Sequence, residues 1–190
     1  MISILLAVLI LATAILATAA LAVRRQRQAL GLDAAPWWMP RRTLRWSGAM
    51  VAGVLGPLLF AKMLVMALAL GSELILPAEG AGMMAGIGVA WLLLPMALLV
   101  IGTAALKLPA AADDKTLDTR EVIRLADGNE WSLMPLGVGL ALGVLLLLGP
   151  AVGVALGTLA YLPLLPLGVV LLVWVSGRLA DRYRSLATTT

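Results

Sequence analysis

The stretch RRQRQALGLDAAPWWMPRRTLRW, residues 24–46, is the only long polar break in the first seventy residues of this 190-residue chain. It contains six arginines, three tryptophans and one acid, Asp33, and uncharged runs flank it on both sides. Basic and aromatic residues next to long apolar runs are typical of the boundary between a membrane and the cytoplasm. The stretch therefore predicts how a membrane-spanning chain is oriented.

The composition supports this interpretation. Hydrophobic residues make up 62% of the chain, charged residues 13%, and the mean hydropathy is +1.04. A chain of this length has too little polar surface to cover a water-soluble globule, so we expect an integral membrane protein. The net charge is +4, but the arginines cluster beside apolar runs. Anionic lipid headgroups are therefore the expected partner, and nucleic acid is not.

Uncharged runs of membrane-spanning length predict five transmembrane helices. A span needs about 20 residues, so the 47 uncharged residues of 131–177 must form two helices joined by a turn. The first run could be read as a signal peptide, but its arginines follow the apolar core, so we expect a first span instead. The prediction is an all-α polytopic membrane protein with a single domain, 1–190. Its helices are expected at about 2–23, 47–71, 81–106, 132–150 and 153–177, with cytoplasmic loops 24–46 and 107–131.

The distribution of basic residues predicts the orientation. Thirteen of the fourteen lysines and arginines lie in 24–46, in 107–130 or after residue 177, and the fourteenth, Lys62, lies within a predicted helix. None lies in the segments on the opposite side. Since basic loops stay on the cytoplasmic side, the N-terminus is expected outside and the C-terminus inside, in a bacterial-type inner (plasma) membrane.

The loop 107–130 has the polar, charged composition of a soluble protein segment. Asp127-Gly128 is typical of a hairpin turn, whereas residues 116–125 are also compatible with a short helix. The hairpin is slightly favoured. The loop holds four basic and six acidic residues, opposite in balance to 24–46. We therefore expect the two loops to pack against each other.

The aromatic and basic residues of 24–46 form the first candidate contact site. They are expected near the headgroups, either as an interfacial anchor or as a docking surface for an anionic lipid or an acidic partner. Pro36 and Pro40 argue against a continuous helix here. Trp91, in the middle of the third run, is expected to face protein because its N–H needs an acceptor. The candidate residues in the loop are Trp37, Trp38, Arg41, Arg42, Arg45 and Trp46.

Lys62 is the second candidate site, because it is the only charge well inside a span. An unpaired lysine at the centre of a helix costs about 2.5–3.5 kcal/mol on insertion scales. One interpretation is that its side chain extends toward the outer interface, to water or to Glu73. The other is that it faces a carboxylate of a partner subunit or an anionic ligand.

Small residues recur at four-residue spacing, which allows close helix packing inside the chain or against other chains. The turn in the last long run is expected between 149 and 160. Gly149-Pro150 is the better helix breaker, whereas Tyr161 and Pro163 would place the turn later. The sets of small residues are Ala52/Gly56, Gly82/Gly86, Gly139/Gly143 and Gly149/Gly153/Gly157.

The segment APWWMP, residues 35–40, resembles the tryptophan-proline segment of the translocator protein family. That resemblance implies a five-helix protein that binds porphyrins or sterols. It covers about a dozen residues, and the chain departs from the aromatic-rich family with one Phe and two Tyr. The family is therefore not assigned.

Function is predicted by elimination. The chain has no His and no Cys, and it carries no recognisable catalytic or phosphate-binding motif, so neither an enzyme nor a cofactor is expected. Proton or cation transport usually requires an acid deep within a span, and no predicted span contains one. The prediction is an accessory or scaffolding subunit of a larger membrane complex. The alternative is a carrier or channel for a small solute, lipid or anion, with Lys62 lining the path.

Overall fold

The computed structural model describes residues 2–32, 39–75, 81–158 and 160–188, and every regular element in these ranges is helical. Five helices are long and apolar enough to cross a membrane, which confirms the predicted number of spans. The elements are α1 (Ile2–Ala29), α2 (Pro40–Met50), the π-helical turn η1 (Val51–Leu55), α3 (Gly56–Ile75), α4 (Ala81–Ala104), α5 (Lys107–Ala112), α6 (Thr119–Ala126), α7 (Glu130–Ala155) and α8 (Leu164–Ala187).

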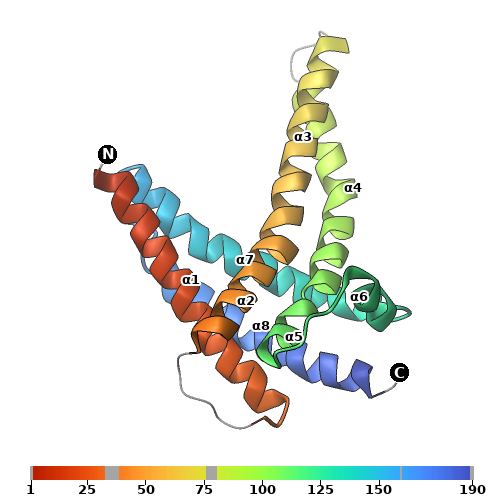
Figure 1. The fold of residues 1–190 in the computed structure, drawn as a ribbon. Coiled ribbons are helices and arrows are strands. Elements are labelled where there is room, and N and C mark those ends of the chain that lie inside the picture. Colours follow the sequence, from red (N-terminus) through yellow and green to blue (C-terminus); the bar gives the residue numbers. More distant parts are fainter. Residues whose placement is uncertain (1, 33–38, 76–80, 159, 189–190) are drawn as a thin grey trace.

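Helices α1, α7 and α8 pack together as a bundle (Figure 1). Glycines bring α7 and α8 into close contact. A Cβ atom added to Gly139 would lie 2.6 Å from Cγ2 of Val175, and one added to Gly143 would lie 2.5 Å from Cγ of Leu172. The predicted use of the Gly139/Gly143 pair in helix packing is confirmed, and it acts within the chain.

Helices α3 and α4 form a hairpin, here called the arm, that projects away from the bundle (Figure 1). The arm is fixed at its base, where α4 crosses α7. Gly102 and Gly137 lie at this crossing, and a Cβ on either would overlap the backbone of the opposite helix. The molecule is therefore V-shaped, and its closed end, here called the basic end, contains α2, α5 and α6 (Figure 1).

The turn η1 joins α2 to α3 without a break in the helix. The N–H of Gly56 donates to the carbonyl oxygen of Val51, five residues back. Pro57 follows and has no N–H to donate, which weakens the α-helical pattern at this point. Gly53 lies inside the turn, and a Cβ atom added to it would lie 3.4 Å from the Cβ of Ala104. The turn itself therefore packs closely on the last residue of α4.

Several predicted boundaries are wrong. The first helix continues beyond residue 23 to Ala29, and the second begins at Pro40 rather than at 47, because proline is well tolerated in the first turn of a helix. The last break falls between Ala155 and Leu164, which overlaps the end of the predicted window 149–160. The last helix, however, begins at Leu164 rather than at 153 and continues past 177 to Ala187. Gly149-Pro150 lies inside α7 and does not end it.

The slightly favoured β-hairpin in 107–130 is also wrong, since the segment forms α5 and α6. Helix α6 begins with a capping box. The Asp118 side chain accepts from the helix backbone, and the Glu121 carboxylate accepts from the N–H of Asp118 at 2.7 Å. Such reciprocal capping stabilises a helix start. Asp127-Gly128 ends this helix instead of turning a hairpin.

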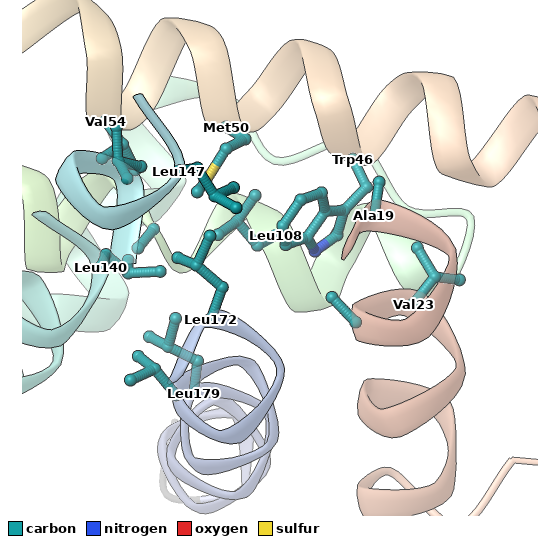
Figure 2. Close-up of a cluster of buried hydrophobic side chains, with 14 of the residues drawn as sticks. Ala19, Val23, Trp46, Met50, Val54, Leu108, Leu140, Leu147, Leu172 and Leu179 are labelled. Carbon is teal, nitrogen blue, oxygen red and sulfur yellow. The ribbon is translucent and has the colours of Figure 1, made fainter. Parts of the chain in front are cut away.

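The largest buried core lies where α1, α2, α7 and α8 meet at the base of the V (Figure 2). Trp46 is the largest of its fully buried side chains. A second, smaller core at the basic end joins α5 and α6 to the last turns of α8. Its buried members are Leu106, Ala110, Val122, Ala126, Leu133, Tyr183 and Leu186.

Candidate functional site

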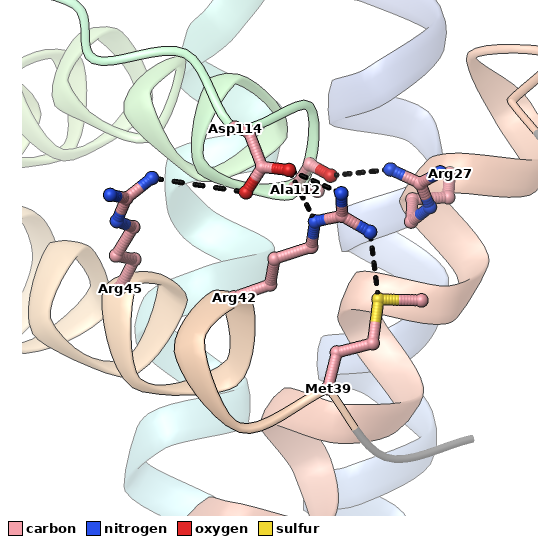
Figure 3. Close-up of polar contacts among 6 residues, drawn as sticks. All are labelled: Arg27, Met39, Arg42, Arg45, Ala112 and Asp114. Carbon is pink, nitrogen blue, oxygen red and sulfur yellow. Dashed lines mark hydrogen bonds and ion pairs between the residues drawn. The ribbon is translucent and has the colours of Figure 1, made fainter. Parts of the chain in front are cut away.

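An ion pair between Arg42 of α2 and Asp114, just after α5, lies at the centre of the basic end (Figure 3). Arg42 Nε donates to Asp114 Oδ2 at 2.7 Å, and Arg42 Nη2 pairs with the same oxygen. Arg45 Nη1 lies 3.8 Å from the other carboxylate oxygen. Arg27, at the end of α1, donates from Nη1 to the carbonyl oxygen of Ala112 at 3.2 Å. These contacts, here called the latch, join α1, α2 and α5.

The backbone positions the Asp114 carboxylate. Asp114 has a φ of 59°, the left-handed conformation that often follows a helix C-terminus. The N–H of Lys115 then donates to the carbonyl oxygen of Ala110 at 2.9 Å, which closes the end of α5. Aspartate tolerates this conformation better than most non-glycine residues. The same residue therefore ends the helix and directs a carboxylate toward α2.

The latch also lowers the pKa of Asp114. The hydrogen bond from Arg42 holds the pKa of Asp114 below its ordinary value, and the charges of Arg42, Arg45 and Arg27 act in the same direction. Asp114 is ionised at neutral pH in any case, and the lowered pKa keeps it ionised at more acidic pH than an ordinary aspartate. The expected packing of the two oppositely charged loops is confirmed at this pair.

A hollow of about 520 Å³ opens beside the latch. It is called the basic pocket below. Of the residues that the structure describes, three arginines and one acid line it, and together these carry a net charge of +2 at neutral pH. The structure thus brings together three of the predicted contact residues, all from α2. The lining residues are Met39, Pro40, Arg41, Arg42, Arg45 and Asp114.

The sequence predicts that Trp46 lies at an exposed interface, near the lipid headgroups, and this prediction is wrong. Its exposed fraction is 1%, and its Nε1–H donates to Oε1 of Gln26 at 3.0 Å. The physical reason is that α1 continues past its arginines, which brings Gln26 against α2. The sequence gives no local signal for this contact, because the buried apolar residues Ala19 and Val23 are followed on the same face of α1 by the polar Gln26, where the apolar pattern ends.

Lys62 and Trp91 both lie on the outer surface of the arm. Lys62 is exposed and forms no hydrogen bond or ion pair with the side chains that the structure describes. The side chain of Glu73 is not among these, so the expected Lys62–Glu73 contact lies outside the described side chains. Trp91 is 75% exposed within this chain, so the protein contact expected for it would have to come from a partner chain, and that expectation stays a prediction. Its helix extends beyond the bundle, where no other part of the described chain covers it.

The arm also carries an apolar groove of about 430 Å³ between its two helices. Phe60 and Met96 are exposed at its rim, and small residues leave space along it. The groove is lined by Gly56, Pro57, Phe60, Ala61, Leu64, Leu93, Met96, Ala97 and Val100. Trp37 and Trp38, the remaining predicted contact residues, lie outside the described residues.

Sequence reasoning missed several polar partners that the fold brings together. Asp114 pairs with Arg42, and Gln26 accepts from Trp46. Asn129 and Ser132 both accept from Arg182 Nη2, at 3.0 and 2.8 Å. These contacts join the start of α7 to α8. Each pair is separated by at least 20 residues, so no local pattern shows it.

Comparison with protein-family models, with curated proteins and with solved structures finds no match to this chain. The geometry above is therefore the only basis for a functional conclusion.

Proposed function

We propose that this protein is an accessory or scaffolding subunit of a larger bacterial-type inner-membrane complex. In this proposal the N-terminus lies outside, the basic end faces the cytoplasm, and the arm contacts a partner subunit. The role is structural rather than catalytic.

The exposure of the arm is the observation that carries the proposal. In the most apolar stretches of the spans, 17% of residues are buried for Pro40–Ala67 and 22% for Gly86–Ala112, against 50% in α7. Lipid can cover apolar side chains, but it cannot pair with a lysine at mid-span. Lys62 and the Trp91 indole N–H both lie on this poorly buried arm. A partner helix with a carboxylate would satisfy the lysine, and one with a polar acceptor would satisfy the indole.

The alternative, a carrier or channel, needs a path through the molecule. Where α1, α2, α7 and α8 meet, the structure has an apolar crevice of about 30 Å³, roughly the space of one water molecule. Lys62 lines neither this crevice nor the arm groove. The geometry therefore favours the scaffold. If solute flux is found, loss of flux in Lys62→Met would support the carrier, and unchanged flux would count against it.

The test uses two matched glycine variants in affinity-tagged, full-length protein. A Cβ at Gly88 on the arm and one at Gly149 on α7 would each meet nothing within 4 Å, so Gly88→Leu and Gly149→Leu should both fold. In mild detergent, the wild type and Gly149→Leu should elute as a complex with the same partner. Gly88→Leu should lose that partner while its own yield is unchanged.

Two results would reject the proposal. One is a stable wild-type monomer without any co-purifying protein, in detergent and in native nanodiscs. The other is a complex that survives both Gly88→Leu and Lys62→Met unchanged, because the arm would then not be the contact surface.

A further inference from the structure

The charge of the basic pocket is incompletely balanced. Among the described residues of its wall, Asp114 is the only acid, and it is engaged mainly by Arg42. Arg45 is 3.8 Å from that carboxylate, and Arg41 makes no hydrogen bond or ion pair with the described residues. Two guanidinium groups, four residues apart on one helix face, are thus available to an anion.

An exposed strip of small residues leads from these arginines along the outside of the chain. Gly48, Ala52 and Gly56 follow Arg45 at spacings of three, four and four residues, and all are exposed. Gly56 also lines the arm groove. At 1.5 Å per residue, the strip from Arg45 to Gly56 is about 16 Å long. That length is comparable to an extended acyl chain, and the small side chains leave room for one.

The geometry points to a bound anionic phospholipid, with its phosphate on Arg41 and Arg45 and one acyl chain along Gly48, Ala52 and Gly56 into the arm groove. A cationic pocket that continues into an apolar strip matches a molecule with an anionic head and an apolar tail. A second copy of this chain fits less well. With both copies in the same orientation in a membrane, docking at this strip would bring two arginine clusters together.

The test measures lipid binding to the purified full-length protein by native mass spectrometry. The two lipids are phosphatidylglycerol and phosphatidylcholine with identical acyl chains. The wild type should bind phosphatidylglycerol at least tenfold more tightly. The double variant Arg41→Gln/Arg45→Gln should lose roughly thirty-fold in that affinity, about fivefold for each arginine near an anionic headgroup.

A matched double variant controls for total charge. Arg24→Gln/Arg120→Gln removes two exposed arginines that do not line the pocket. It should keep the wild-type affinity. Equal losses in the two double variants would overturn the proposal, because they would indicate a general attraction of the basic end for anionic lipid.

Asp114→Asn gives a test of opposite sign. Asparagine also tolerates the left-handed conformation, and its amide removes the negative charge from the pocket wall. Affinity for phosphatidylglycerol should rise severalfold, whereas a purely structural role of the pocket predicts a fall. A fall would count against the site.

Two further measurements distinguish binding of a lipid from binding of a soluble anion. Gly48→Leu places a side chain on the strip without a clash inside the chain, and it should weaken lipid binding by blocking the acyl chain. Inorganic phosphate at millimolar concentration should not displace the lipid. If phosphate displaces it fully and Gly48→Leu has no effect, the site binds free phosphate and the lipid proposal is wrong.

Discussion

The bundle and the arm are built from similar apolar helices, but they use their glycines differently. Where α7 contacts α8 and where α4 crosses α7, glycines allow backbones and large side chains to touch, whereas Gly149 of α7 lies away from these contacts and has nothing within 4 Å of its Cβ position. Gly137, for example, lies against the carbonyl group of Leu98. On the arm, Gly88 is exposed and nothing lies near it. The comparison teaches that a small residue indicates close packing only where another helix contacts the chain at that residue, and the sequence alone does not say where that is.

Gly137→Leu is the strongest way to test the comparison. The added side chain would overlap the backbone of α4, which cannot move as a flexible side chain can. We expect a loss of about 3 kcal/mol or more in the free energy of unfolding, at the upper end of overpacking costs. Denaturant unfolding in mixed micelles measures it. Gly88→Leu, made in parallel, should leave the free energy of unfolding almost unchanged. Equal losses of unfolding free energy in the two variants would contradict the difference between the two regions.

Trp46→Phe tests the core at the base of the V. The variant removes the indole N–H, so Gln26 Oε1 is left buried without its donor. We expect a loss of about 1–3 kcal/mol in unfolding free energy. Gln26→Leu/Trp46→Phe should lose less than the sum of the two single variants, because both partners of one hydrogen bond are then absent. Strict additivity would show that the hydrogen bond contributes nothing.

Asp114→Asn tests the latch, whose pair is partly exposed. We expect a loss of about 0.5 kcal/mol, as for other exposed ion pairs. Because the folded-state pKa of Asp114 is lowered, its contribution is complete above the ordinary aspartate value and is lost as the pH falls through the lowered pKa. Unfolding measured against pH should show this acid-side loss in the wild type and not in Asp114→Asn. Asp181→Asn, an exposed acid of the same charge, should retain it.

The smallest expected effect concerns Lys62. In detergent, Lys62→Met should change the unfolding free energy of the isolated protein by less than about 0.5 kcal/mol, because its side chain is exposed and has no described partner. Thermal unfolding measures this. A large change in either direction would show that Lys62 is paired within the chain, and the arm would then resemble the bundle more closely.

The number of spans could be predicted because each requires a long uncharged run, and such runs are visible in the sequence. The helix ends could not be predicted, since charges do not end a helix. Arg24, Arg25 and Arg27 continue α1, and Pro40 starts α2. The orientation of the chain in a membrane remains a prediction.

Of the candidate site, the basic residues of α2 could be predicted, but not their surroundings. Opposite loop charges indicated that two loops meet, yet the choice of Asp114 among six acids depends on its left-handed backbone after α5. The burial of Trp46 depends on Gln26, twenty residues away. Both are tertiary effects that no local pattern contains.

The π turn between α2 and α3 has a consequence for how this chain tolerates insertions and deletions. A turn that closes five residues back holds one residue more than the α-helical pattern allows. Deleting one residue from Val51–Leu55 would remove that excess and leave an unbroken α-helix of otherwise identical composition. Because the wider turn already absorbs the extra residue, the faces of the arm would keep nearly their present direction relative to Arg41 and Arg45. A deletion in the α-helical residues between Gly56 and Lys62 has no such excess to remove, so it would turn Lys62 by about 100° relative to the arginines.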